Sequence, residues 1–113
     1  MNIQVENKKL LNAVNFATNQ TSSSDAINDA LAYAIQFIWS GATAMAGDLI
    51  VEGSNVDDVN TFVPVSTTSI TGETSGSALI NVERAGYAFV RVRWVYSSGS
   101  GGTLTVYLSS KRL

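Results

Sequence analysis

Two adjacent carboxylates, Asp57 and Asp58, stand in the segment GSNVDDVN, and Asn55 and Asn60 flank them. Carboxylate and amide oxygens are the ligands that calcium prefers in proteins. The spacing is not that of an EF-hand loop, however, and Asn and Asp also satisfy backbone groups in ordinary turns. We therefore interpret the segment as a solvated turn and expect no metal site.

Nucleophilic and metal-dependent chemistry lack their usual residues in this sequence. It has no His and no Cys, which excludes Ser–His and Cys–His nucleophiles and the common zinc and iron sites. The segment GSGG, residues 99–102, has neither the spacing of a phosphate-binding loop nor a helical pattern after it. Nothing marks a glycosidase pair among the nine carboxylates. We expect a protein with no catalytic residues and no cofactor.

Residues 86–111 are predicted to form a hairpin around which the rest of the chain packs. Two runs rich in β-branched and aromatic residues flank the loop SSGSGG, residues 97–102. Side chains of a strand alternate between its two faces, so one face of the hairpin is apolar. This apolar face carries Ala88, Val90, Val92, Trp94, Tyr96, Leu104, Val106 and Leu108. A lone hairpin is marginal in water, so the apolar face requires a second sheet above it.

The opposite face of the predicted hairpin combines aromatic and arginine side chains. Its members are Tyr87, Phe89, Arg91, Arg93 and Tyr107. Aromatic residues and arginine together are typical of the hot spots of protein interfaces. Two alternatives are ordinary cross-strand pairing on a half-solvated sheet, and a second buried layer if the two faces are inverted. The five residues are therefore a hypothesis for an interface, not a catalytic or ligand site.

The composition favours one folded domain with a weakly charged surface. The chain has 113 residues, of which 45% are hydrophobic and only 14% charged. Such surfaces, rich in Ser, Thr, Asn and Gly, are common on proteins that pack against copies of themselves. The net charge of −2 argues against nucleic acid as a partner, because phosphate binding needs clustered Lys and Arg.

The sequence also indicates where the protein is made. It has no cysteine for a disulfide, and its first residues show no apolar segment followed by a signal-peptide cleavage site. The longest apolar run, residues 31–39, is interrupted by Gln36 and is too short to span a bilayer. We expect synthesis in a cytoplasm and no membrane insertion.

Outside the hairpin, alternating apolar residues predict further short strands. The first nine residues are predicted to be an N-terminal arm, and residues 10–113 the folded domain. Expected strands cover residues 10–16, 33–39, 48–53, 61–66 and 77–83. Their expected inward residues are Ile35, Phe37, Trp39, Leu49 and Val51, with Asp48 and Glu52 outward. Pro64 cannot donate to a ladder, so its strand is predicted at an edge or a bulge.

The segments between these strands are mostly polar. Residues 40–47 and 67–76 are expected to be loops. Residues 25–32 fit either a capped helical turn or a short strand with a tight turn at Asn28 and Asp29; the lack of a long apolar stripe favours the strand. About eight short strands separated by Gly, Ser and Thr are typical of an all-β fold. We expect an antiparallel β-sandwich of the jelly-roll type.

Three stretches of the chain resemble small virion structural proteins of bacteriophages. They are AIQFIWSG (34–41), DLIVEGSNVDDVNTFVPV (48–65) and AGYAFVRVRWVYSSGSGGTLTVYLSSK (85–111). The resemblance implies a jelly-roll-like module that decorates a capsid, forms a head fibre or belongs to a tail or spike. The family often has an Asn-Asp-Gly turn after its Gly-Ser-Asn strand, and this chain has residues 55–58 there instead. Any ligand role of that loop is therefore not implied.

The resemblance implies a non-enzymatic virion protein that binds copies of itself, as a trimer, and other virion proteins. The alternative is a carbohydrate-binding β-sandwich module, which would stack exposed aromatic rings on a surface glycan. Alternation turns Trp39 and Trp94 inward, which counts against such a platform. The remaining aromatic residues that could stack on sugars are Tyr33, Tyr87, Tyr96 and Tyr107.

Overall fold

The computed structural model describes residues 4–27, 32–82 and 87–112, and the regular structure of these residues is entirely β-strand. The strands are β1 (Gln4–Asn15), β2 (Gln20–Thr21), β3 (Asp25–Ala26), β4 (Ala32–Ser54), β5 (Val63–Glu73), β6 (Gly76–Val82) and β7 (Phe89–Arg112). They form one antiparallel sheet in the order β1-β7-β4-β5, while β2 and β3 pair with β7 and β6 pairs with β4. The described residues contain no helix that could cross a membrane.

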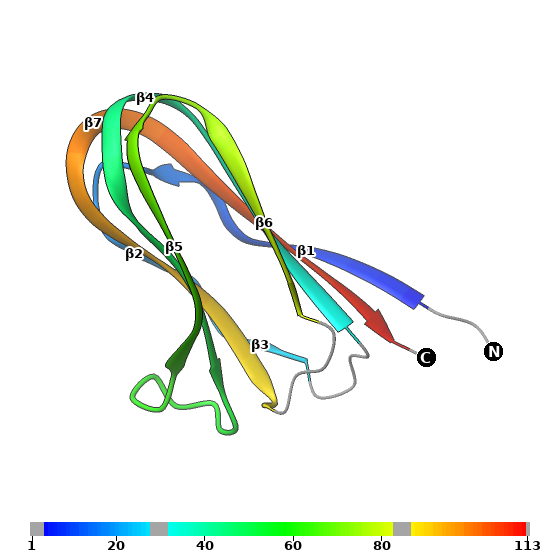
Figure 1. Ribbon diagram of the computed structural model, residues 1–113. Coiled ribbons are helices and arrows are strands. Elements are labelled where there is room, and N and C mark those ends of the chain that lie inside the picture. Colours follow the sequence, from blue (N-terminus) through cyan, green and yellow to red (C-terminus); the bar gives the residue numbers. More distant parts are fainter. Residues whose placement is uncertain (1–3, 28–31, 83–86, 113) are drawn as a thin grey trace.

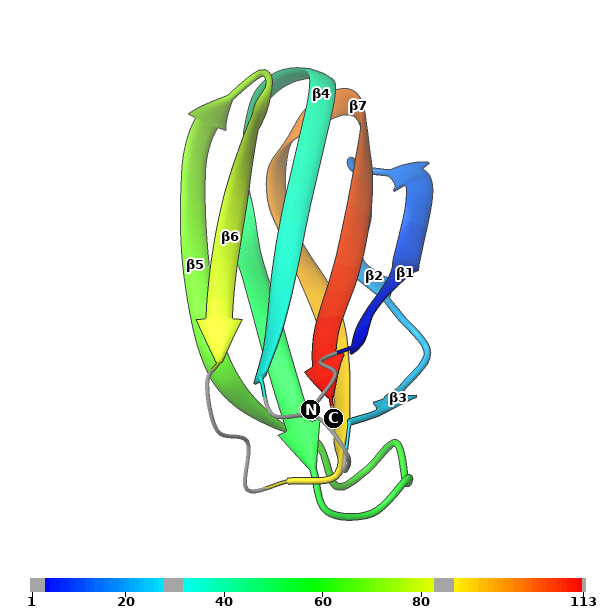
Figure 2. The ribbon, with the colours of Figure 1, turned by 90° about the vertical axis from the view of Figure 1, so that its right-hand side faces the viewer.

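The sheet folds over on itself because its two central strands are long. β4 has 23 residues and β7 has 24, and they pair from Ala32 with Lys111 to Ser54 with Phe89. Figure 1 shows both strands turning through a bend and returning, so that one sheet makes two layers. The turned view in Figure 2 shows β6, β4, β7 and β1 side by side. The molecule is therefore a β-sandwich built from a single folded sheet.

Each layer contains one part of the two central strands, β4 and β7. The first layer consists of β2, β3, β5 and residues 47–54 of β4 with 89–96 of β7. The second layer consists of β1, β6 and residues 32–40 of β4 with 103–112 of β7. In the first layer the loop between β4 and β5 extends beyond the strands (Figure 1).

Backbone conformations that only glycine adopts easily concentrate at the bend. Gly41 of β4 has φ +73°, and Gly99 of β7 has φ +112°. The pairing of β4 with β7 also shifts between Thr43 and Gly47, as a β-bulge does. Bulges and positive-φ glycines turn a strand sharply without ending its ladder. Ala44 also has a positive φ, +48°, although it is not glycine.

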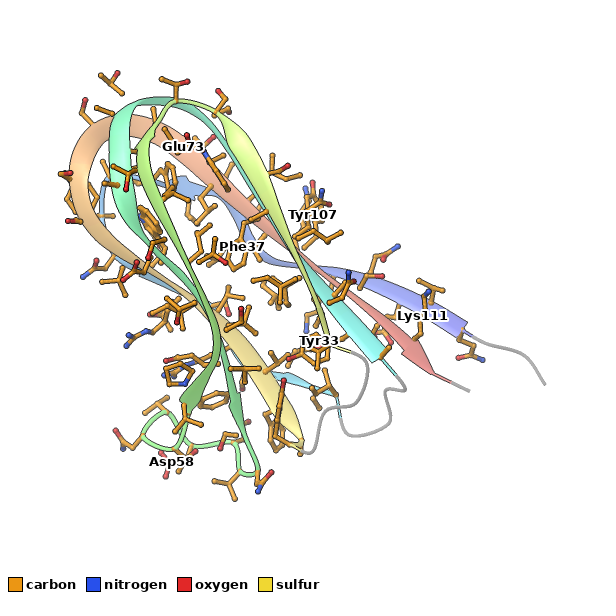
Figure 3. The ribbon with its side chains drawn as sticks, viewed as in Figure 1. Tyr33, Phe37, Asp58, Glu73, Tyr107 and Lys111 are labelled. Carbon is orange, nitrogen blue, oxygen red and sulfur yellow. The ribbon has the colours of Figure 1, made fainter. Side chains whose placement is uncertain are left out.

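The core lies between the two layers, and aromatic residues fill it near the bend. The rings of Phe16 and Trp94 have centroids 4.5 Å apart, and Phe16 and Trp39 are 6.1 Å apart. The indole Nε1–H of Trp94 donates a 2.8 Å hydrogen bond to the carbonyl of Phe16. Phe37 lies between the layers farther from the bend (Figure 3). Burial of these side chains is the main force that holds the layers together.

The predicted fold class is confirmed, and so are several facings. The chain is an all-β antiparallel sandwich with a jelly-roll-like fold. The side chains expected to point inward are buried: Ile35, Phe37, Trp39, Leu49, Val51, Val92 and Trp94. The strand of Pro64 is at an edge, as predicted, because β5 pairs with β4 alone among the described strands.

The predicted hairpin is wrong. Residues 97–102 do not reverse the chain between two paired strands; they carry β7 around the bend into the other layer. The expected loop at residues 40–47 is likewise the bend of β4, and most of the expected loop at 67–76 belongs to β5. The strands are consequently fewer and longer than expected, because glycine here bends a ladder and does not end it.

The chain segment expected as an arm takes part in the sheet. Residues 4–9 pair with β7, from Gln4 opposite Arg112 to Lys9 opposite Tyr107, although their side chains are exposed. Lys8 connects β1 of the second layer to β3 of the first layer through a 2.6 Å ion pair with Asp25. The expected strand near residue 25 is present as β3, while the turn expected at residues 28 and 29 lies outside the described residues.

Candidate interaction surfaces

The structure does not bring the five expected interface residues together. Tyr107 belongs to the second layer, on its outer side (Figure 3). Phe89 and the two arginines belong to the first layer, where Phe89 is half-buried between Ala26 and Ser54. The bend of β7 causes this separation, because it carries the two halves of the predicted hairpin into different layers.

Tyr87 turns toward the core. Its ring packs against Gly53, where an added Cβ would lie 2.6 Å from Cδ2 of Tyr87. The hydroxyl groups of Tyr87 and Tyr33 form a hydrogen bond, and their rings meet edge to face with centroids 6.3 Å apart. Burial and this hydrogen bond raise the pKa of the Tyr33 hydroxyl far above its usual value. The two tyrosines therefore close one end of the core and do not offer a free surface.

Glu52 is a buried carboxylate that holds both arginines on the outside of the first layer. Its side chain is only 4% exposed. Nε of Arg91 donates to its Oε1 at 2.7 Å, and Nε of Arg93 lies 3.5 Å from Oε2. That Nε of Arg93 has no hydrogen-bond partner among the described residues. The two arginines supply the opposite charge that a buried carboxylate needs.

The loop between β4 and β5 covers part of this charged group. The guanidinium carbon of Arg91 lies 4.4 Å from the ring centroid of Phe62, which is a cation–π contact. Asp57 of the same loop accepts a hydrogen bond from the hydroxyl of Ser24, which lies between β2 and β3 on the opposite side of β7. The loop therefore crosses the outer end of the first layer, and Glu52 and Phe62 occupy the Arg91 side chain, while the Arg93 side chain stays 40% exposed.

The Asp57–Asp58 segment behaves as a turn. The Asp58 carboxylate accepts from the amide of Asn60 at 3.0 Å, and its carbonyl accepts from the amide and the hydroxyl of Thr61. The side chains of Asp58 and its neighbours are exposed at the end of the molecule (Figure 3). Within the described residues, no three acidic side chains gather as metal ligands.

The outer face of the second layer is nearly free of charge. From β4, β6 and β7 the outward side chains are Ala34, Gln36, Ile38, Ser40, Ser77, Leu79, Asn81, Thr103, Thr105, Tyr107, Ser109 and Lys111. Leu79 is 61% exposed and Ile38 is 39% exposed. The Lys9 ammonium lies over the Tyr107 ring, 5.6 Å from its centroid. A hollow of about 300 Å³ lies at this face, and its lining includes Ala34, Asn81, Ser109 and Lys111.

The edge strands differ in how they are protected against pairing with other chains. Natural proteins protect edges with charged residues, proline or bulges. Strand β1 has Glu6, Lys8, Lys9 and two register shifts. Strand β5 has Pro64 and Glu73. Strand β6, with the sequence GSALINV, has neither charge nor proline.

Aromatic side chains do not form an exposed platform. All ten aromatic residues of the chain are described, and each is buried or half-buried. Of the tyrosines that could stack on sugars, Tyr33 is buried, Tyr96 donates its hydroxyl to the carbonyl of Gly99, and Tyr107 lies beneath Lys9. This arrangement gives the carbohydrate-binding alternative little support.

Sequence reasoning missed the burial of Glu52. Alternation correctly placed Glu52 on the outward face of its strand, but a residue on that face was expected to be exposed to solvent. A signal was present: Arg91 and Arg93 are two positions apart, so they share the outer face of one strand and can both reach an acid on a neighbouring strand. The partner strand could not be known without the pairing of β4 with β7.

Solved structures share this fold across nearly the whole chain. The SPBc2 prophage-derived protein YomS has a TM-score of 0.61 at 13% identity, covering 98% of this chain and 96% of YomS. A protein of Bacillus endospore appendages, which form disulfide-linked pili, has a TM-score of 0.61 at 18% identity, covering 100% of this chain and 92% of its own. A chain of infectious bursal disease virus, strain Gx, has a TM-score of 0.65 at 11% identity, covering 97% of this chain but 32% of its own.

These identities are low, so the likeness establishes a common fold only. Neither protein-family models nor curated protein sequences give a match to this chain.

Proposed function

We propose that this protein is a non-enzymatic structural component of a bacteriophage particle, acting through contacts with copies of itself and with other virion proteins. The observation that carries the proposal is the weakly charged outer face of the second layer, which continues to the unprotected edge strand β6. Exposed apolar side chains next to an open edge are typical of surfaces that another protein covers.

The comparisons support a structural role without naming it. The fold recurs in a prophage-derived protein, in a pilus-forming protein and in a virus. This chain has no cysteine, so it cannot form disulfide links like those of the pili. Its assembly would rest on non-covalent contacts. The virion is the proposed location, as a capsid decoration, head fibre, tail or spike component.

Molar mass in solution tests the proposal. Light scattering on the purified protein at micromolar to high micromolar concentration is expected to show a discrete oligomer. Affinity chromatography on immobilised polysaccharides tests the alternative in parallel, with retention expected to be absent. A monomer that a polysaccharide column retains would overturn the proposal in favour of a carbohydrate-binding module.

A further inference from the structure

We propose that β6 pairs with β6 of a second copy, in antiparallel orientation about Leu79, and joins two second layers into one continuous sheet. The inference rests on the proposed self-association and names the surface that makes it. Three observations carry it: the chemistry of the edge, the side chains on it, and the symmetry of its sequence.

The backbone of an edge strand demands a partner strand. Strand β6 pairs with β4 on one side, from Tyr33 with Val82 to Trp39 with Gly76. On its other side the described residues provide no strand. Every second residue of an edge strand directs its N–H and C=O away from the sheet, and another strand satisfies such a row in full. The edges at β1 and β5 have charges or proline that oppose such pairing, and β6 has none.

The side chains of β6 are only partly covered within one copy. Leu79 is 61% exposed and points outward. The inward residues Ala78, Ile80 and Val82 pack against the core but remain half-buried. A strand placed alongside β6 would cover residues of both sets at once, because cross-strand neighbours on each face come into contact.

The sequence of β6 is complementary to itself, which identifies the occupant as a second copy. With Leu79 opposite Leu79 of the second copy, the outward Ser77 of one copy lies opposite Asn81 of the other, so a polar side chain pairs with a polar side chain. On the inward face Ala78 meets Ile80 and Gly76 meets Val82, so each large apolar residue faces a small one. No two like charges come together. A contact that places the same surface on both partners is the usual arrangement of a homodimer.

The symmetry also places the first layers correctly. A twofold axis perpendicular to the sheet at Leu79 keeps both outer faces on one side and both first layers on the other. The β5 edges of the two copies then face each other on the side of the first layers, because β5 and β6 lie on the same side of β4. A stable contact needs about 1,200–2,000 Å² in total. This pairing closes as a dimer and not as the trimer that the family resemblance implies.

A charge exchange at Leu79 tests the pairing. Leu79→Lys and Leu79→Glu each place like charges opposite each other at the axis, so each variant alone is expected to associate at least roughly tenfold more weakly than the parent. An equal mixture places Lys opposite Glu and is expected to restore the dimer. Val5→Lys is the matched control, because Val5 is 57% exposed in the same layer but on β1, and this variant is expected to remain dimeric.

Sedimentation equilibrium gives the masses, and circular dichroism verifies that each variant is folded. An oligomer that persists in both Leu79 variants, or a mixture that does not re-form dimers, would overturn the β6 pairing and leave the proposed self-association intact. A parent that is monomeric at high micromolar concentration would overturn both. Because Leu79 is exposed and outward, loss of folding in either variant would also contradict its assigned position.

Discussion

Nε of Arg91 lies 2.7 Å from Oε1 of Glu52, with the arginine side chain 12% exposed and the carboxylate 4% exposed. Glu52→Gln keeps the shape of the side chain but removes the charge that balances Arg91. We expect a loss of about 3 kcal/mol in the free energy of unfolding, because an unbalanced charge then stays nearly buried. Urea denaturation measures the loss. Asp48→Asn is the control: Asp48 is less buried and accepts from Ser69, and its loss is expected below about 1 kcal/mol.

The same pair limits how the first layer can be probed. Arg91→Glu would place two carboxylates together, so a charge reversal at this position reports on folding before it reports on association. If Glu52→Gln and Asp48→Asn lowered the free energy of unfolding equally, the ion pair of Glu52 with Arg91 would be solvent-exposed and not buried.

Val92→Asp is expected to prevent folding. Val92 is fully buried between the layers, and an unpaired buried carboxylate costs several kcal/mol against a total stability of about 5–15 kcal/mol. Thr105→Asp is expected to cost no more than roughly 1 kcal/mol, since Thr105 faces outward and its hydroxyl accepts from the amide of Ala13, as a carboxylate also can. Circular dichroism with thermal melting compares them. Equal damage would mean that the outer face of the second layer is buried.

Gly99→Ala is expected to lower the free energy of unfolding by more than about 2 kcal/mol. At φ +112° its added Cβ would lie 2.6 Å from Cα of Met45, so backbone strain and a clash with backbone combine. Gly72→Ala separates the two effects. It has φ +67° and nothing within 4 Å of the added Cβ, so only the strain of roughly 1–2 kcal/mol remains. If denaturation curves gave the same loss for both, the close approach of β7 to β4 at the bend would be refuted.

Stability is expected to fall above pH 10 because of Tyr33. Burial and the hydrogen bond with Tyr87 raise the pKa of Tyr33, so the hydroxyl stays protonated in the folded chain while it ionises near pH 10 in the unfolded chain. The contribution is complete below pH 10, and above it the free energy of unfolding declines by about 1.4 kcal/mol per pH unit.

Tyr33→Phe removes this titration, so its decline between pH 10 and 11.5 should be shallower than that of the parent. Lys8 also has a raised pKa, owing to its hydrogen bond with Asp25, and contributes a loss in the same direction in both proteins. Urea denaturation at stepped pH measures the difference. If the free energy of unfolding of the parent and of Tyr33→Phe declined in parallel with pH, Tyr33 would ionise at the same pH in the folded and the unfolded chain.

Alternation predicted much of the core because it is a local property. Phe37, Leu49 and Trp94 lie on strands whose inner face can be read from every second residue. The bend was not predictable in the same way. Glycine and serine between two β-rich runs fit a hairpin turn and a bent strand equally well. What decides between them is the partner strand, since β4 bends alongside β7 at its own Gly41.

The five residues proposed as an interface do not share one face, for the same reason. The five residues share a face only if residues 87–111 form a hairpin, and the bend moves Tyr107 into the other layer. The face of Arg91 was correctly placed outward, but the sequence did not show that Glu52 and Phe62 would occupy it. Both come from segments whose position depends on long-range pairing.

The ladder between β1 and β7 sets how this protein bears mechanical load. Gln4 is paired with Arg112, and both described ends leave the same end of the molecule (Figure 1). A pull on these two residues in opposite directions would peel β1 from β7, breaking the hydrogen bonds in succession. Force applied across the flank of the sheet is instead shared by all the bonds of a strand. In the proposed structural role, attachment by the flank would therefore resist tension better than tethering by the two ends.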